Sequence, residues 1–244
     1  MAKFTYYGGM ALKIERSDGF KIMIDPYIHN SLCQDATPDM FYDMDVLLIS
    51  HAAFDHFGET VDILRHSNAT IVCGTETWAR VRGEADIPES RHINVIYGDG
   101  ARFGQTEVRF VPAWHGSNVV YHGAAHAYYP FGIIVKLEPG VSLYHTGDTS
   151  IFSDIKLIRE LYRPNIMMPC ISTIDVKYGS IMSPVEAAQA IRWVGPDLVI
   201  PGHYYQGDPA VEEFKVHMRS FNPESEVFWE VGKPVEFLPR RIVY

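Results

Sequence analysis

The sequence predicts an α/β protein in which two β-sheets pack together and carry helices on their outer faces. Three observations favour this fold class. Short strand patterns alternate with helix patterns, the first half of the chain is rich in strands, and the second half reads strand, helix, strand, helix. No low-complexity linker and no strong internal repeat interrupts the order, so we expect a single domain over residues 1–244.

The predicted strands are short apolar runs bounded by turn residues. The first three are separated by the turn signals "GGM" and "RSDG". Strands are expected at 4–7, 11–15, 20–25, 46–50, 70–73, 94–97, 106–112, 132–137, 141–146, 166–169 and 197–201.

The predicted helices lie between these strands and follow them. They are expected at 59–67, 76–82, 151–163, 183–194 and 209–221. The fourth of them begins with "SPVEAAQA". Ser183 can cap the first turn, Pro184 suits the first helical position, and Glu186 stands three residues after the cap, as in a capping box.

Composition excludes several classes of protein. Apolar residues make up 47% of the chain and charged residues 21%, which is ordinary for a globular protein. No apolar run approaches the ~20 residues of a membrane span, and the start lacks a secretory signal. Cys33, Cys73 and Cys170 form no CxxC pair, so we expect reduced thiols and a cytoplasmic location. The net charge of −9 argues against nucleic acid as a partner.

Four stretches share one pattern, in which an apolar strand ends and a His or Asp follows. They are "LLISHAAFDH", "VRFVPAWHGS", "VSLYHTGDTS" and "DLVIPGHYYQ". The carboxyl ends of strands are where α/β sheets place their ligands. The stretches together supply four imidazoles and two carboxylates, a set that suits Zn, Mn or Fe. The candidate metal ligands are His51, Asp55, His56, His115, Asp148 and His203.

Five of the six candidates also have a structural interpretation. His51 and His56 can hydrogen-bond a buried turn, His115 can be a core residue, Asp148 can cap the helix that follows it, and His203 can be a turn residue. We favour metal binding because four such stretches in order, each following a strand, seldom arise by chance.

Other polar residues close to these stretches have weaker claims. His145 is expected to be structural or to support a ligand from behind, because it points to the opposite side of its strand. Asp25 in "IDPY" either orients a ligand histidine or forms a turn before Pro26. Cys170 is expected to be an inert core thiol. Tyr204 and Tyr205 either line a pocket or pack.

The loop at 47–59, "YHTGDT" and "IPGHY" together resemble the metallo-β-lactamase-like hydrolase superfamily, whose core motif is His-x-His-x-Asp-His. The stretches "FTYYGGMALKIE", "KIMIDPY" and "LYHTGDTSIFSDIKLI" look most like the small cytoplasmic hydrolases related to ascorbate-6-phosphate lactonase. The resemblance spans nearly the whole chain. It implies a four-layer αββα sandwich with the metals at one edge, between the sheets.

The resemblance also implies two metal positions. The first would use His51, a histidine at position 53 and His115, and the second would use Asp55, His56 and His203, with Asp148 bridging both. This sequence departs from the family at two places, because Ala53 replaces a ligand histidine and Gly9 stands where related small hydrolases often have histidine.

The loss at Ala53 predicts an asymmetric centre. The second position is complete, so we expect one divalent ion, most simply Zn, to be held well and a second to be weak or absent. His122 and His126, in the segment after His115, are alternative replacements for the missing ligand, although histidines in a polar loop are more often solvated.

The expected function is a metal-dependent hydrolase that uses metal-activated water on an ester, lactone or similar bond of a small polar metabolite. Asp55 would orient the water or take its proton. Two alternatives remain: a non-catalytic or weakly active ligand-binding protein that keeps the fold, which Ala53 and Gly9 favour, and redox chemistry on a single iron, which the ligand set permits. A small-molecule substrate, no membrane partner and a homo-oligomer are the expectations for partners.

Overall fold

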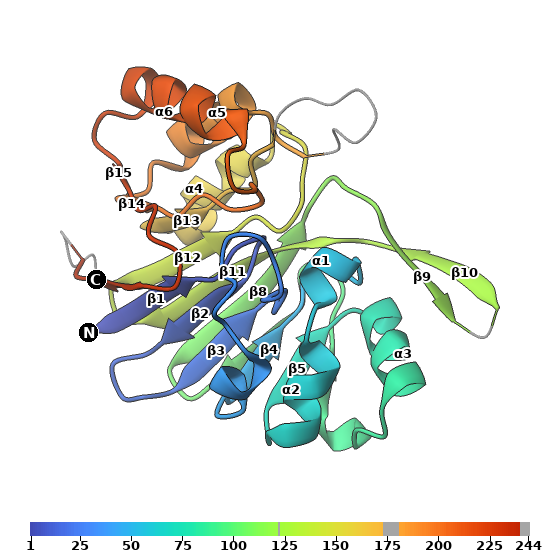
Figure 1. The fold of residues 1–244 in the computed structure, drawn as a ribbon. Coiled ribbons are helices and arrows are strands. Elements are labelled where there is room, and N and C mark those ends of the chain that lie inside the picture. The colour runs from blue at the N-terminus through green and yellow to red at the C-terminus, as the bar shows by residue number, and fades with distance from the viewer. Residues whose placement is uncertain (122, 173–180, 240–244) are drawn as a thin grey trace.

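Two large β-sheets pack face to face, and helices cover both outer faces (Figure 1). The computed structural model describes residues 1–121, 123–172 and 181–239. The predicted α/β fold class, an αββα sandwich, is therefore confirmed.

The first sheet consists of strands from the amino-terminal part of the chain and one strand from its carboxyl-terminal part. The strands run parallel from β3 to β6, and the other neighbours are antiparallel. Their spatial order is β16 (Pro234–Phe237), β1 (Ala2–Tyr6), β2 (Leu12–Glu15), β3 (Lys21–Ile24), β4 (Val46–Leu48), β5 (Thr70–Cys73) and β6 (His92–Asn94).

The second sheet continues the chain. It is parallel from β12 to β15 and antiparallel elsewhere. Its spatial order is β15 (Glu226–Val227), β14 (Leu198–Val199), β13 (Ile166–Met168), β12 (Val141–His145), β11 (Phe131–Glu138), β8 (Thr106–Pro112) and β7 (Gly100–Phe103). The two sheets place the carboxyl ends of β4, β12 and β14 at one edge of the sandwich, as Figure 1 shows.

Helices lie in two groups. One group lies beside the first sheet and consists of α1 (Phe54–Phe57), α2 (Thr60–His66) and α3 (Thr75–Glu84), with the short 3₁₀ turns η1 (Pro38–Phe41) and η2 (Glu89–Arg91) nearby in the chain. The other lies beside the second sheet and consists of α4 (Ile155–Tyr162), α5 (Pro184–Val194) and α6 (Pro209–Phe221). Among the described residues, no helix is both long and apolar enough to cross a membrane.

The central strands β3, β4 and β5 of the first sheet are largely buried on both faces, and alternation decides which core each side chain joins. Leu48 belongs to the core between the sheets, together with Phe110 and Ile133 of the second sheet. Its neighbour Leu47 points the other way and joins the outer core under α2 and α3 with Trp78. Both faces of β4 therefore need apolar side chains. This explains why its sequence is an uninterrupted apolar run rather than an alternating one.

Most predicted elements are present, with shifted ends. The capping box is confirmed: the Ser183 hydroxyl accepts the Glu186 amide, and the Glu186 carboxylate accepts the Ser183 amide at 2.9 Å. The strand predicted at 94–97 is found at His92–Asn94, and the helix predicted at 151–163 begins only at Ile155.

One expectation was wrong. The segment after His115 is not a polar loop but an antiparallel hairpin of β9 (Ser117–Tyr121) and β10 (Ala124–Tyr128), which projects from the body of the molecule (Figure 1). Its sequence, "YHGAAHAYY", lacks the clear apolar alternation that marks a strand. His126 is paired in register with Val119, and His122 lies outside the described residues.

Candidate metal centre

Four strand ends bring the six candidate ligands to one edge of the sandwich. His51 follows β4, His115 follows β8, Asp148 follows β12 and His203 follows β14. Asp55 and His56 lie on the short helix α1, directly after the loop that carries His51. Parallel strands end at the same edge, so residues separated by up to 152 positions in the chain become neighbours at this edge.

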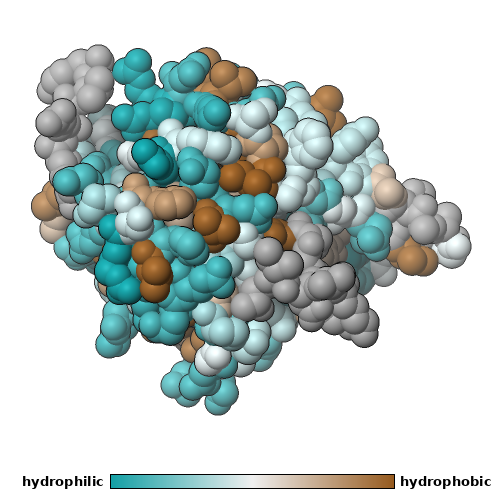
Figure 2. All heavy atoms as spheres, turned by 90° about the horizontal axis from the view of Figure 1, so that it is seen from above, coloured by the Kyte–Doolittle hydropathy of each residue, from teal (hydrophilic) through white to brown (hydrophobic). Residues whose placement is uncertain are grey.

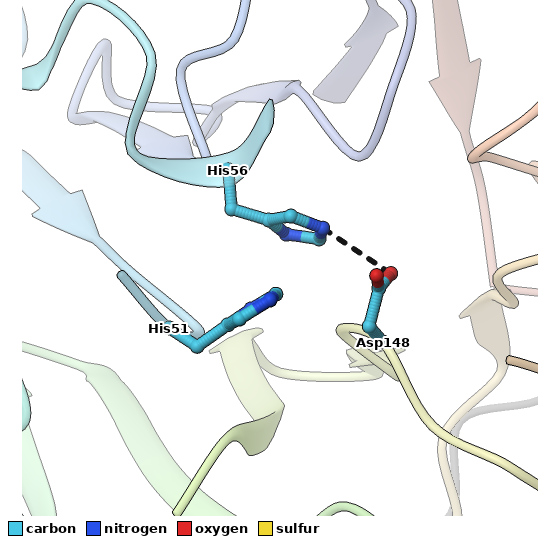
Figure 3. Close-up of side chains that lie close together, drawn as sticks. All are labelled: His51, His56 and Asp148. Atoms are coloured by element: carbon cyan, nitrogen blue, oxygen red, sulfur yellow. Dashed lines mark ion pairs between the residues drawn. The ribbon is translucent and has the colours of Figure 1, made fainter. Parts of the chain in front are cut away.

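Asp148 lies at the centre of this group. Its Oδ1 atom is 3.2 Å from Nε2 of His56, and its Oδ2 atom is 3.1 Å from Nε2 of His203 and 3.7 Å from Nε2 of His115. The residue as a whole is 3% exposed. Figure 3 shows the rings of His51 and His56 beside it, with His56 directed at the carboxylate.

The donor atoms form two overlapping triads, each with all its ligand atoms within 4.8 Å of one another. One triad is Asp55, His56 and His203, and the other is His51, His56 and Asp148. The Oδ2 atom of Asp55 is 3.4 Å from Nε2 of His203. His115 lies just outside both triads, with its ring centroid 5.3 Å from that of His51.

Apart from the ion-pair contacts given above, several buried atoms at or facing Asp148 lack hydrogen-bond partners within the described residues. These buried atoms are Nε2 of His51, His56 and His203, and Oδ1 of Asp148. Buried polar atoms are seldom left unsatisfied, because the loss of water is then uncompensated. Three imidazole nitrogens and a carboxylate oxygen that share this condition at one edge of the sandwich are ligand atoms that suit a divalent cation.

The opposite ring nitrogens are anchored. Nδ1 of His56 is 2.8 Å from Oδ2 of Asp25 and 3.2 Å from the Ser50 hydroxyl, and Nδ1 of His51 is 3.1 Å from the same hydroxyl. Asp25 also accepts the Ser50 amide at 2.7 Å. The predicted orienting role of Asp25 thus agrees with the geometry, and this contact leaves Nε2 of His56 for a cation.

Burial and charge act on the pKa values of the two neighbouring histidines in opposite ways. Burial, helped by the nearby His56, lowers the pKa of His51 to about 3. Burial also disfavours the charged form of His56, but the carboxylates of Asp148 and Asp25 outweigh it and raise its pKa to about 10. The carboxylates of Asp148 and Asp25 therefore stabilise a positive charge at His56, whether a proton or a cation in its place carries it.

The pKa values of the carboxylates and of His203 follow the same balance. Burial opposes ionisation of Asp148, but His203 and His56 keep its pKa well below the ordinary value. Burial alone would lower the pKa of His203, whereas Asp148 raises it well above the ordinary value. Burial would raise the pKa of Asp55, but its contact with His203 lowers it. All three residues are therefore charged at neutral pH, and they hold one another in place.

Backbone constraints position the ligands. Gly147, just before Asp148, has φ +57°, and a Cβ there would lie 2.4 Å from the carbonyl oxygen of Phe131. Gly58, just after α1, has φ +40°, and a Cβ there would lie 2.3 Å from the carbonyl oxygen of Pro26. Only glycine allows these close approaches. His203 itself has φ +67°, uncommon for a residue with a side chain, and its amide donates to the Gly9 carbonyl at 2.6 Å.

Two residues close to the centre, His145 and Cys170, have other roles. Nε2 of His145 is 2.9 Å from the Met10 carbonyl, and its Nδ1 accepts the Gly147 amide at 3.2 Å, so it is a structural residue as predicted. The Cys170 thiol is buried, donates to the Thr149 carbonyl at 3.4 Å, and has a pKa raised by burial, which agrees with an inert thiol.

Sequence reasoning did not identify the support under the loop that carries His51. The Ala52 amide donates to the Ser117 hydroxyl at 3.4 Å, and this hydroxyl donates to Glu76 at 3.1 Å. Glu76 is 2% exposed and burial raises its pKa. A glutamate in the first turn of a helix gives no signal in the sequence that it is buried.

Open space lies on both sides of Asp55. A cavity of about 480 Å³ is lined by Ala53, Asp55, Arg80, Glu84 and Asn118 among others, so the position of the missing histidine faces open volume. A second cavity of about 390 Å³ begins at Gly9, Asp55 and His203 and extends to Asp208. The two departures from the family pattern, Ala53 and Gly9, therefore each line a cavity beside the centre.

Comparisons with known proteins agree with this geometry. The family model of the beta-lactamase superfamily domain matches residues 21–204. A metal-dependent hydrolase of Rubrobacter xylanophilus is 32% identical over 243 residues, which cover 97% of this chain and 96% of the relative. A metal-dependent hydrolase of Pyrococcus furiosus is 35% identical over 223 residues, which cover 88% of this chain and 91% of the relative.

Solved structures of hydrolases share the fold of this chain. Igni18, a metallo hydrolase from the archaeon Ignicoccus hospitalis, matches with a TM-score of 0.78 and 27% identity, over 97% of this chain and 99% of that one. An isothiocyanate hydrolase from Delia radicum gut bacteria matches with a TM-score of 0.74 and 16% identity, over 96% of this chain and 99% of that one. The second likeness concerns the fold alone.

Proposed function

This chain belongs to the beta-lactamase superfamily and to its metal-dependent hydrolases, and we propose that it hydrolyses an ester, lactone or similar bond of a small polar metabolite. The observation that carries the proposal is the set of unsatisfied buried atoms, Nε2 of His51, His56 and His203 with Oδ1 of Asp148, gathered at one edge of the sheets. A structural role would have supplied these atoms with hydrogen-bond partners.

We assign one well-held divalent ion to Asp55, His56 and His203, with Asp148 beside them. Zn suits this mixture of imidazole and carboxylate best, and Mn and Fe are accommodated by the same ligands. His51, His115 and Asp148 would hold a second ion weakly or not at all, because Ala53 supplies no ligand atom there.

The cation, when bound, lowers the pKa of water toward ~7 and polarises the bond to be broken. The chain supplies the other requirements. Asp55 is the ligand that borders both cavities, its pKa is lowered by His203, and it is therefore an ionised acceptor that can orient a water molecule or take its proton. His56 cannot shift toward the substrate, because Asp25 holds its far nitrogen.

The proposed partner is a small molecule. The two cavities, of about 480 and 390 Å³, are in the range of small-molecule sites. On the described part of the face in Figure 2, hydrophobic residues form small separate groups among hydrophilic ones, which does not favour a broad apolar partner. A cytoplasmic location and a homo-oligomer remain proposals from the sequence.

A second function is favoured by Ala53. The residue removes one ligand of the family's first metal position, and a protein that binds a metabolite without turning it over would tolerate this loss. Retained buried carboxylates argue for the enzyme, because Asp148 and Asp25 are costly in the interior without a positive partner.

Metal content per chain, measured by elemental analysis after mild purification, tests the proposal. We expect about one ion per chain in the wild type and none in His203→Ala, followed by activity in a screen of small esters and lactones. Two ions per chain would contradict the asymmetric centre. An absence of metal, even after reloading with Zn or Mn, would overturn the hydrolase proposal and leave the metabolite-binding protein.

A further inference from the structure

The cavity of about 390 Å³ beside the metal centre has its own chemical character. It lies between the loop after β1, the loop after β3 and the loop after β14. Asp55 and His203 border it at one end, and Asp208 borders it too. A molecule that occupies this cavity therefore lies against two of the proposed metal ligands.

Tyrosine rings form much of the wall. Tyr204 is held by Tyr6 and Trp229, with ring centroids 5.9 and 5.8 Å away, and burial raises its pKa to about 12, so its hydroxyl stays neutral. Tyr27 and the exposed Tyr205 complete this aromatic part of the lining. Aromatic faces carry negative potential and attract organic cations.

The amide of Asn30 also lines the cavity, but it is already used. Its nitrogen donates to the carbonyls of Tyr7 and Tyr27, both at 2.8 Å, and its oxygen accepts the Leu32 amide at 3.0 Å. Asn30 therefore fixes the wall and has little capacity left to recognise a ligand.

The charged groups in the described lining are two carboxylates and a histidine of the proposed centre, with no lysine or arginine among them. Asp208 is 4% exposed. Its Oδ1 accepts the Ala210 amide at 2.9 Å and so caps α6, whereas its buried Oδ2 has no hydrogen-bond partner in the described part of the chain. A buried carboxylate oxygen without a partner is costly, and a ligand that donates to it removes that cost.

We propose that this cavity binds an organic ammonium group of the substrate, with Oδ2 of Asp208 as its acceptor and the tyrosine rings around it. The inference rests on the proposed hydrolase in one respect: when the ammonium group of the substrate occupies this cavity, the rest of the substrate places its hydrolysable bond at Asp55 and His203. A substrate with a phosphate or carboxylate at this end would place its negative charge beside Asp208, where the described lining offers no lysine or arginine to offset it.

Binding of three probes to the metal-loaded full-length protein tests this inference. Benzylammonium, benzyl alcohol and benzenesulfonate share one aromatic body and differ in charge, and none contains a hydrolysable bond. The sulfonate is also a weak metal ligand. We expect benzylammonium to bind about tenfold more tightly than benzyl alcohol, as a charge-assisted hydrogen bond implies, and benzenesulfonate to bind least, in calorimetry near pH 7.

Asp208→Asn isolates the carboxylate. Asparagine caps helices as well as aspartate does, so α6 stays capped. We expect the preference for benzylammonium over benzyl alcohol to fall to about twofold or less, with the affinity for the alcohol unchanged. Asp154→Asn is the matched control, because Asp154 stands at the start of α4, is exposed and does not line the cavity.

Two results would overturn the inference: tighter binding of benzenesulfonate than of benzylammonium, or an unchanged preference in Asp208→Asn. Failure of the hydrolase proposal would give a different result. The protein would then lack metal or activity, but it would still bind benzylammonium more tightly than benzyl alcohol and benzenesulfonate.

Discussion

Nδ1 of His56 donates a hydrogen bond to Oδ2 of Asp25 across 2.8 Å, and both side chains are completely buried. The pKa of Asp25 is lowered, because His56 outweighs the opposing effect of burial, so the carboxylate is ionised and the proton belongs to the imidazole. The hydrogen bond fixes the tautomer of His56 and directs its Nε2 at the proposed metal position.

Asp25→Asn should weaken metal binding about 10- to 100-fold, the usual effect of losing a carboxylate behind a ligand histidine. Asparagine tolerates the left-handed backbone of this residue, φ +46°, so the fold should persist. Competition with a chromophoric chelator measures the affinity. Asp35→Asn, at an exposed position, is the control, and equal affinities in both variants would contradict the orienting role of Asp25.

Ala53→His should increase the metal content from about one ion per chain to about two. Ala53 borders an open cavity, so an imidazole has room there, next to the triad of His51, His56 and Asp148. Elemental analysis gives the count. Ala53→Phe fills the same space without a ligand nitrogen and should keep the wild-type content, and a rise in both variants would show that volume rather than ligation matters.

Metal binding at pH 7 should release about one to two protons per ion. The pKa of His56 is raised to about 10 by Asp148 and Asp25, which outweigh burial, and Asp148 raises that of His203 well above its ordinary value. Both rings hold protons below those values, so the cation must displace them and its affinity should increase as pH rises toward about 10. Calorimetry in two buffers with different ionisation enthalpies measures the release. Binding without proton release would exclude these rings as ligands.

Glu76→Gln should change how stability depends on pH. Burial raises the pKa of Glu76, so the folded protein holds its proton more tightly than the unfolded chain does. Ionisation therefore costs stability as pH rises above about 4.5, the ordinary value of this carboxyl group. The variant cannot ionise, so its melting temperature should improve relative to wild type between pH 5 and pH 8. An unchanged difference over that range would show that Glu76 is ionised even when folded.

Much of the fold was predictable because local patterns and tertiary packing agree. Strand β4 is apolar throughout, β12 is mostly apolar and ends at His145, and α5 begins at a complete capping box. The sequence predicted two possible roles for Asp25, orienting a ligand histidine or forming a turn. It could not decide between them, because an aspartate before proline often forms a turn.

Other features depend on contacts that no local pattern contains. The burial of Glu76 results from Ser117 in a hairpin that is 41 residues away in the sequence. The hairpin itself was not predicted, since "YHGAAHAYY" has no strong alternation and few strongly apolar residues. The unsatisfied Oδ2 of Asp208 is likewise invisible in the sequence, where the residue is an ordinary cap before Pro209.

The pairing of β16 with β1 has a consequence for biosynthesis. The edge strand of the first sheet follows its neighbour by more than two hundred residues, and the proposed metal ligands are distributed from His51 to His203. A ribosome must therefore synthesise β16 before the sheet can acquire its last strand, and His203 before the ion can acquire its last ligand. Until then the nascent chain has an unpaired sheet edge and a half-built coordination sphere. Metal loading should accordingly be a late event, which follows synthesis of the segment that carries His203 rather than guiding the early steps of folding.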